Sequence, residues 1–109
     1  MEIRFKNKTL PELCEKRVAA VRKLGDVGAR KLQSRLADVE AAEKVADLRA
    51  GRPHPLTGDR LGQFAVDLSA GWRLVLAPAN EPIPRRDDAS VDWSRVTIVS
   101  IEYIGDYHD

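Results

Sequence analysis

Six side chains of this 109-residue sequence could act together on a phosphodiester bond of RNA. They are His54, Arg60, Arg73, Asp106, Tyr107 and His108. Such a cleavage needs a general base to take the proton of the ribose 2′-hydroxyl, and a general acid to protonate the leaving 5′-oxygen. Imidazole, with an ordinary pKa of about 6.5, performs either task near neutral pH. A planar arginine fork suits the charge on the phosphoryl oxygens, and a tyrosine can stack on a base.

Taken singly, these residues have simpler interpretations. A histidine on a loop is more often a packing or surface residue than a catalyst. An arginine on a strand usually pairs with a carboxylate such as Asp67 or Glu102, and a terminal Tyr-His-Asp is more often a frayed end. The combination is more informative, because the two histidines of the chain both lie in segments that a small sheet could bring together at one edge.

Other chemistries fit the sequence less well. A metal site would need a third or fourth ligand at suitable spacing, which two histidines and scattered acids do not supply. Cys14, the single cysteine, lies on a helix face predicted to be buried, so a thiol nucleophile is not expected. The run from Gly58 to Gly62 lacks the Lys-Ser/Thr of a phosphate-binding loop and precedes a strand. The sequence therefore favours acid–base chemistry with neither metal nor cofactor.

A β-hairpin is predicted in the middle of the chain. Apolar residues alternate with small or polar ones over residues 64–68, the period-2 pattern of a half-buried strand. Residues 69–71 (Ser-Ala-Gly) supply turn chemistry, and residues 72–76 are typical of the returning strand. We expect this hairpin to carry Arg73 and to lie beside a rigid, proline-flanked loop that carries His54.

The other segments predict a helical layer and two further strands. Thr9 and Glu12 match a capping box at the start of the first helix, and Gly25 suits the position that ends it. The predicted elements are strands at 2–5 and 96–104, helices at 10–24 and 26–39, a short third helix at 42–49 and a long surface loop at 78–94. This order predicts one α+β domain spanning residues 1–109, a small, mostly antiparallel sheet of about four strands with an N-terminal helical hairpin packed on it.

Composition and charge narrow the class of protein. The chain has no apolar run of membrane-spanning length, no apolar segment typical of a signal peptide, and no possible internal disulfide, so we expect a cytoplasmic protein with no membrane partner. The net charge is +1, but residues 1–36 carry +6 and residues 37–109 carry −5. This asymmetry indicates either a basic face for an anionic partner or simply helices with solvated Lys and Arg side chains.

A family resemblance can be drawn from these motifs. The run His54-Pro-Leu-Thr-Gly-Asp-Arg60, followed by Gly62, by Trp72-Arg73 before an apolar strand and by Asp106-Tyr107-His108, resembles the HigB toxins of the RelE/ParE toxin–antitoxin superfamily. The resemblance implies a RelE-like fold and an mRNA interferase that cuts messenger RNA in the ribosomal A site. It assigns catalysis to His54, Arg73, Asp106, Tyr107 and His108. Arg73 would stabilise phosphate charge, and Arg60 would help to bind the RNA backbone.

The resemblance also implies partners and leaves two alternatives. The partners are the ribosome with its mRNA and a helix-turn-helix, HigA-like antitoxin, through which alone operator DNA would be bound. Some members of the superfamily inhibit DNA gyrase and cut no RNA, so a ParE-like toxin is one alternative. A catalytically inactive module that binds only its antitoxin is the other. Neither alternative needs the histidines.

Overall fold

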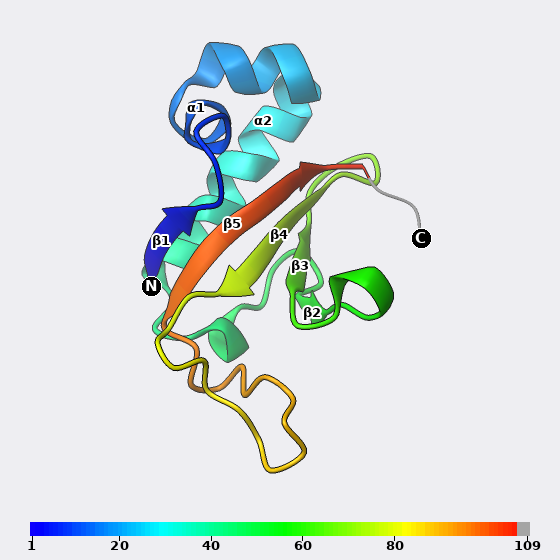
Figure 1. The fold of residues 1–109 in the computed structure, drawn as a ribbon. Helices are drawn as coiled ribbons and strands as arrows, with labels where there is room; N and C mark the ends of the chain where they lie inside the picture. Colours follow the sequence, from blue (N-terminus) through cyan, green and yellow to red (C-terminus); the bar gives the residue numbers. More distant parts are fainter. Residues whose placement is uncertain (107–109) are drawn as a thin grey trace.

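A five-stranded sheet with helices on one face forms the fold (Figure 1). The computed structural model describes residues 1–106. Its strands, in the spatial order β1-β5-β4-β3-β2, are β1 (Glu2–Phe5), β5 (Ile98–Gly105), β4 (Arg73–Pro78), β3 (Phe64–Asp67) and β2 (His54–Pro55). Only β1 and β5 pair in parallel; the other neighbours are antiparallel. The predicted α+β class, with a mostly antiparallel sheet, is confirmed.

The sheet has one strand more than predicted, because the segment that carries His54 is β2 and not a loop. His54 pairs with Ala65 of β3, and Pro55 pairs with Phe64. Proline restricts both its own backbone and that of the preceding residue to extended conformations, and it is tolerated in a strand at a sheet edge. The two prolines around His54 thus favour an edge strand here.

The hairpin of β3 and β4 forms as predicted. The Trp72 amide donates to the Ser69 carbonyl (3.0 Å), and the Leu68 amide donates to the Trp72 carbonyl (2.8 Å). Ala70 and Gly71, at the centre of the turn, have φ of 54° and 79°. Positive φ at both central residues characterises the type I′ turn, whose twist matches that of the flanking strands.

The helical layer differs from the prediction in where its helices begin and end. Helix α1 (Leu10–Glu15) is short, and α2 (Arg17–Ala41) is long. The predicted first helix is broken at Lys16, which is extended. The predicted break at Gly25 is confirmed, because its backbone is not helical (φ 77°, ψ 173°) and α2 consists of two helices joined by a kink at this residue.

Two local predictions in this layer were wrong. Thr9 makes no capping hydrogen bond with its side chain, because its own backbone is already helical (φ −84°, ψ −28°). The Asn7 carboxamide oxygen instead accepts from the Thr9 and Leu10 amides. The predicted third helix is reduced to a 3₁₀ turn, η1 (Val45–Asp47), because the Val45 amide donates to the Val96 carbonyl across the core.

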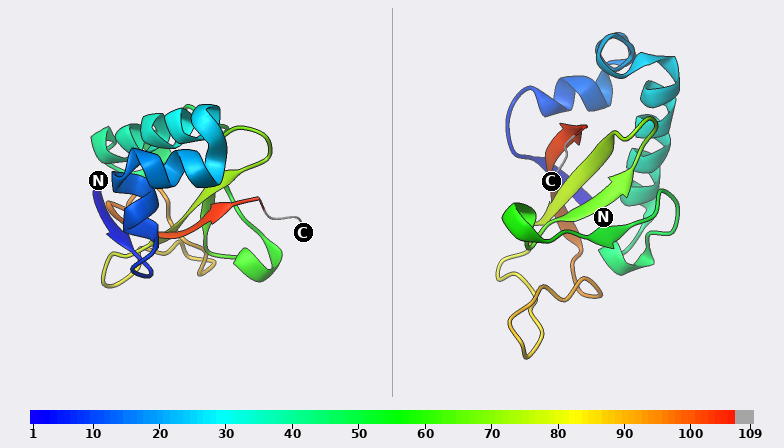
Figure 2. Two further views of the ribbon diagram at one scale, coloured as in Figure 1. Left: turned by 90° about the horizontal axis from the view of Figure 1, so that it is seen from above. Right: turned by 90° about the vertical axis from the view of Figure 1, so that its right-hand side faces the viewer.

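The main core lies between the helices and one face of the sheet (Figure 2). Its fully buried side chains come from both layers and include Leu32, Val39, Leu74, Leu76, Val99 and Ile101. The long segment between β4 and β5 is a surface loop, as predicted, and its Val91 and Val96 reach into the same core. Within residues 1–106, no helix is long and apolar enough to cross a membrane.

Candidate functional site

The face of the sheet that points away from the helices carries the candidate site, and we call it the open face. The strand register aligns His54, Ala65, Val75 and Tyr103 in one row across β2, β3, β4 and β5. Directly paired residues point to the same side of a sheet. The alternate residues Phe64, Val66, Leu74 and Leu76 belong to the main core, so this row faces away from it.

The next row toward the end of β5 carries the charged groups. Asp67 of β3 pairs with Arg73 of β4, which pairs with Gly105 of β5. Asp106 follows Gly105 directly and is exposed. A Cβ atom built on Gly71 would lie 3.6 Å from Asp106 Oδ1, so the carboxylate lies against the β3–β4 turn. The register thus brings Arg73 and Asp106 to the same end of the sheet, beside the β3–β4 turn.

A β-bulge in β5 sets which side chains of that strand face the site. Val75 pairs with Tyr103 but the next residue of β4, Leu76, pairs with Ile101, so Glu102 is an extra residue. One extra residue reverses the alternation of side chains. Ile101 and Ile104 consequently both face the core, and Tyr103 lies on the open face.

Arg73 is held by an ion pair that it shares with a second arginine. Its Nε donates to Asp67 Oδ1 at 3.1 Å, and Arg52 Nε donates to Asp67 Oδ2 at 2.9 Å. The Arg73 side chain is 25% exposed and that of Arg52 is 67% exposed. The simple expectation that Arg73 pairs with Asp67 is confirmed. The pair also fixes the direction of a guanidinium on the open face.

His54 is oriented by a backbone carbonyl. Its Nδ1 lies 2.8 Å from the Arg52 carbonyl oxygen. A carbonyl oxygen only accepts, so Nδ1 carries the proton, and Nε2 is the nitrogen that exchanges protons with other groups. Arg52 has φ of 48°, which is uncommon for a residue other than glycine, and its side chain pairs with Asp67. One residue therefore links His54 and the Asp67–Arg73 pair.

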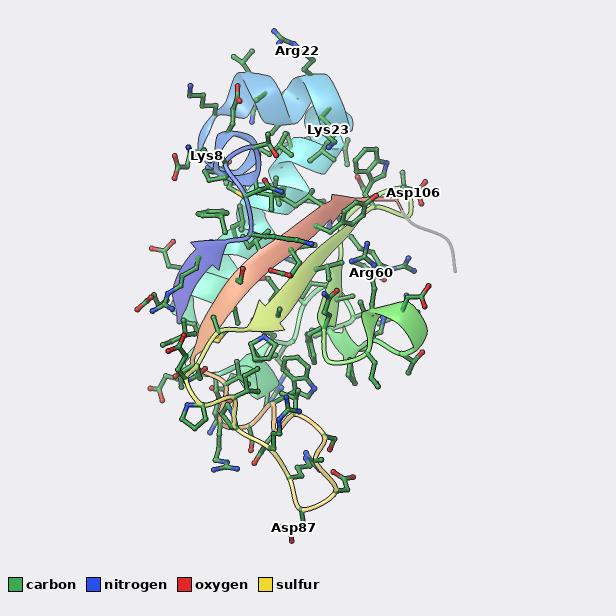
Figure 3. The ribbon with its side chains drawn as sticks, viewed as in Figure 1. Lys8, Arg22, Lys23, Arg60, Asp87 and Asp106 are labelled. Carbon is green, nitrogen blue, oxygen red and sulfur yellow. The ribbon has the colours of Figure 1, made fainter. Side chains whose placement is uncertain are left out.

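Arg60 and Tyr103 stack against each other beside these groups. Arg60 ends the 3₁₀ turn η2 (Gly58–Arg60), and its guanidinium carbon lies over the Tyr103 ring, 4.7 Å from the centroid. Arg60 Nη1 also donates to Gln63 Oε1 at 3.2 Å. In Figure 3, Arg60 points from η2 toward the end of β5 that carries Asp106.

Of the six residues predicted from the sequence, the structure places His54, Arg60 and Arg73 on the open face, and Asp106 beside the β3–β4 turn after β5. Tyr107 and His108 lie outside the described residues. Sequence reasoning missed Tyr103 and Arg52. Tyr103 lies within the predicted last strand, but the pattern of apolar residues in that strand does not predict the bulge that turns Tyr103 to the open face. In the sequence, only the preceding Gly51 indicates a turn at the position where Arg52 adopts its unusual backbone conformation.

The described residues offer no second site of comparable chemistry. Among residues 1–106, no three His, Cys, Asp or Glu side chains converge as metal ligands do. Cys14 lies in α1, in the helical layer. Burial, with a smaller contribution from the charge of Glu15, raises the pKa of its thiol to about 11. A thiol with that pKa is a poor nucleophile near neutral pH.

Comparison with known proteins agrees with the architecture. No protein-family model and no curated protein sequence matches this chain. The fold, a small sheet with a helical layer on one face, is RelE-like. Among solved structures, the chain is similar to the YoeB/ParE toxin from Agrobacterium tumefaciens, with a TM-score of 0.56 and 12% identity over 99% of this chain and 100% of that chain. At this level of identity the likeness establishes the fold.

Proposed function

We propose that this protein is the toxin of a type II toxin–antitoxin system and a ribosome-dependent endoribonuclease. It cuts mRNA in the ribosomal A site by attack of the 2′-hydroxyl on the adjacent phosphorus, with no metal. The observation that carries the proposal is that His54 and Arg73 lie on the open face of a sheet with the RelE-like fold, with Asp106 directly after β5 at the end that carries Arg73. His54 lies in β2, Arg73 lies in β4 and Asp106 directly follows β5, at positions far apart in the sequence.

The chemistry divides between acid–base groups and a cation. A base removes the 2′-hydroxyl proton, the 2′-oxygen bonds to phosphorus, and the 5′-oxygen leaves with a proton from an acid. The products are a 2′,3′-cyclic phosphate and a 5′-hydroxyl. His54 and His108 fill the acid and base roles, one each, and Asp106 and Tyr107 complete the catalytic set. Arg73 stabilises the charge that builds up on the phosphoryl oxygens.

The helical layer supports ribosome binding. Exposed basic side chains follow α1 and α2, and Figure 3 shows Lys8, Arg22 and Lys23 at the outer end of this layer. Lys and Arg side chains bind the phosphates of RNA and give the affinity a strong dependence on salt. The rest of the proposal concerns regulation: a HigA-like helix-turn-helix antitoxin neutralises the protein, and operator DNA is bound only through that antitoxin.

The test is cleavage of a defined mRNA on programmed ribosomes, with ends mapped by primer extension. Wild type should cut within the A-site codon, only when ribosomes are present, and equally well in EDTA. Arg73→Ala and His108→Ala should lower the rate at least about 100-fold. Arg86→Ala is the matched control, since Arg86 is exposed on the loop between β4 and β5 and should leave cleavage unchanged.

The alternatives make different predictions in the same assays. The similar solved structure is named a YoeB/ParE toxin, so gyrase inhibition, the activity of ParE-like toxins, is the competing function to test. A gyrase inhibitor would block DNA supercoiling, leave mRNA intact and tolerate loss of both histidines. A protein that does neither, yet binds its antitoxin, would be a catalytically inactive module.

A further inference from the structure

We propose that Arg60, held over Tyr103, is a shelf on which a base of the RNA stacks, and that this pair determines the base preference of cleavage. This role rests on the proposed function, because it needs RNA on the open face. It differs from the contact with the RNA backbone that the sequence predicted for Arg60.

The position of the Tyr103 ring is fixed by its own strand. The bulge at Glu102 turns Tyr103 to the open face, and Gly105, two residues on, makes room for the ring. A Cβ on Gly105 would lie 2.5 Å from Tyr103 Oη and 2.6 Å from Cζ. The ring therefore extends along β5 toward Arg73, which pairs with Gly105.

Arg60 is held on the Tyr103 ring by the segment that joins β2 to β3. Leu56, Ala65 and Val75 form a small buried cluster against which Tyr103 packs, so the segment from β2 to β3 folds down onto the open face. Arg60 reaches over Tyr103 from this segment, with Nη1 bonded to Gln63. A half-buried guanidinium with an aromatic ring beneath it and a side-chain amide at its edge is oriented before any ligand arrives.

An oriented guanidinium plane is a recognition surface for nucleobases. Proteins read single-stranded RNA by stacking its unstacked bases on aromatic rings or on arginine planes. Arg60 covers one face of the Tyr103 ring, so the shelf itself is the arginine. Lysine keeps the positive charge but has no plane, so Arg60→Lys separates stacking from simple attraction to phosphate.

The shelf lies beside the expected position of the scissile phosphate. Tyr103 and Gly105 are two residues apart on one strand, or about 7 Å, and Gly105 pairs with Arg73. A nucleotide whose phosphate contacts Arg73 can therefore reach Arg60 with its base. The base read in this way belongs to a nucleotide that adjoins the cut.

The experiment measures cleavage rates on programmed ribosomes for messages that differ only in the A-site codon. The proteins are wild type, Arg60→Lys, Arg60→Ala, Tyr103→Phe, Tyr103→Leu and the Arg86→Ala control, each checked for native circular dichroism. Wild type should distinguish bases at one codon position. Arg60→Lys, Arg60→Ala and Tyr103→Leu should reduce that contrast about two- to threefold, because differences in stacking strength give modest base preferences, whereas Tyr103→Phe keeps the ring and should preserve it.

Three results would overturn the shelf. One is a wild type that cuts every codon equally, and another is an Arg60→Lys profile identical to that of wild type. The third is an Arg60→Ala rate lowered by one factor at all codons, which would make Arg60 a phosphate contact. A wild type that cuts no message on ribosomes would instead refute the proposed function, and the shelf with it.

Discussion

Replacing Gly105 with alanine should displace Tyr103 without straining the backbone. Gly105 does not have the positive φ that would demand glycine, so alanine is tolerated there by the main chain. Its Cβ, however, would lie 2.5 to 2.8 Å from Oη, Cζ and Cε2 of Tyr103, where ordinary contacts are 3.4–4 Å. The far end of a side chain yields more easily than a strand does. The Tyr103 ring should therefore move by about 1 Å or leave its position, as overpacked side chains do.

The loss of folding stability follows from the contacts that the displaced Tyr103 ring no longer makes. The stack with Arg60 contributes about 0.5–1 kcal/mol at a partly exposed site. Lost packing of the ring on Val75 brings the total to about 1–2 kcal/mol. For a domain of this size each kcal/mol lowers the melting temperature by about 4–8 °C, so Gly105→Ala should melt about 5–15 °C below wild type.

A double-mutant cycle tests this reasoning. Urea unfolding would be measured for wild type, Gly105→Ala, Tyr103→Ala and the double variant. Where Tyr103 has been removed, the added methyl group meets no ring, so Gly105→Ala should cost less than about 0.5 kcal/mol in that background. Equal costs in the two backgrounds would show that alanine disturbs the strand and not the Tyr103 ring.

Three further predictions concern other parts of the molecule. Asp67→Asn removes the negative charge that holds Arg73 and should lower the cleavage rate constant about 10- to 100-fold. Both side chains of the pair are partly exposed, so the loss of stability should stay at about 1 kcal/mol. A normal rate with a large fall in melting temperature would contradict this. Cys14, with its pKa raised to about 11, should be thiolate in only about one molecule in a thousand at pH 8. It should therefore react with a thiol reagent far more slowly in the native than in the denatured protein, and equal rates would refute its burial. Hydrogen bonds, first from the Ser94 side chain, lower the pKa of Asp92 to about 2. Because the pKa of Asp92 is lower in the folded than in the unfolded protein, this stabilisation is present above about pH 4 and lost toward pH 2. The melting temperature of Asp92→Asn should therefore fall less than that of wild type between about pH 4 and pH 2; an equal fall would contradict this.

Much of the sheet could be predicted because its signals are local. Alternation over residues 64–68, the Ser-Ala-Gly turn and the β-branched run before Asp106 each specify structure without distant partners. The hairpin then places Arg73, and the last strand places Asp106, so the two could be expected at one edge. The proline-flanked segment around His54 was expected beside the hairpin and is in fact paired with it.

The rest depended on tertiary contacts that no local pattern records. The bulge at Glu102 arises from the register between β4 and β5, and it alone turns Tyr103 to the open face. The start of α1 is capped by Asn7 because Thr9 is already helical, and the third helix loses its backbone bonds to the core around Val96. The bulge and the shortened third helix depend on partners distant in the sequence, whereas the Asn7 cap is local and accompanies the helical backbone of Thr9.

The most direct test of the central claim uses the chemistry of the substrate. A message on programmed ribosomes would carry a single 2′-deoxy nucleotide immediately before the scissile phosphate, beside an all-ribose control. The account predicts that the control is cut, leaving a 2′,3′-cyclic phosphate and a 5′-hydroxyl, and that the 2′-deoxy message is not cut at that bond. Cleavage of both messages at the same bond and rate would show that the 2′-hydroxyl is not the nucleophile.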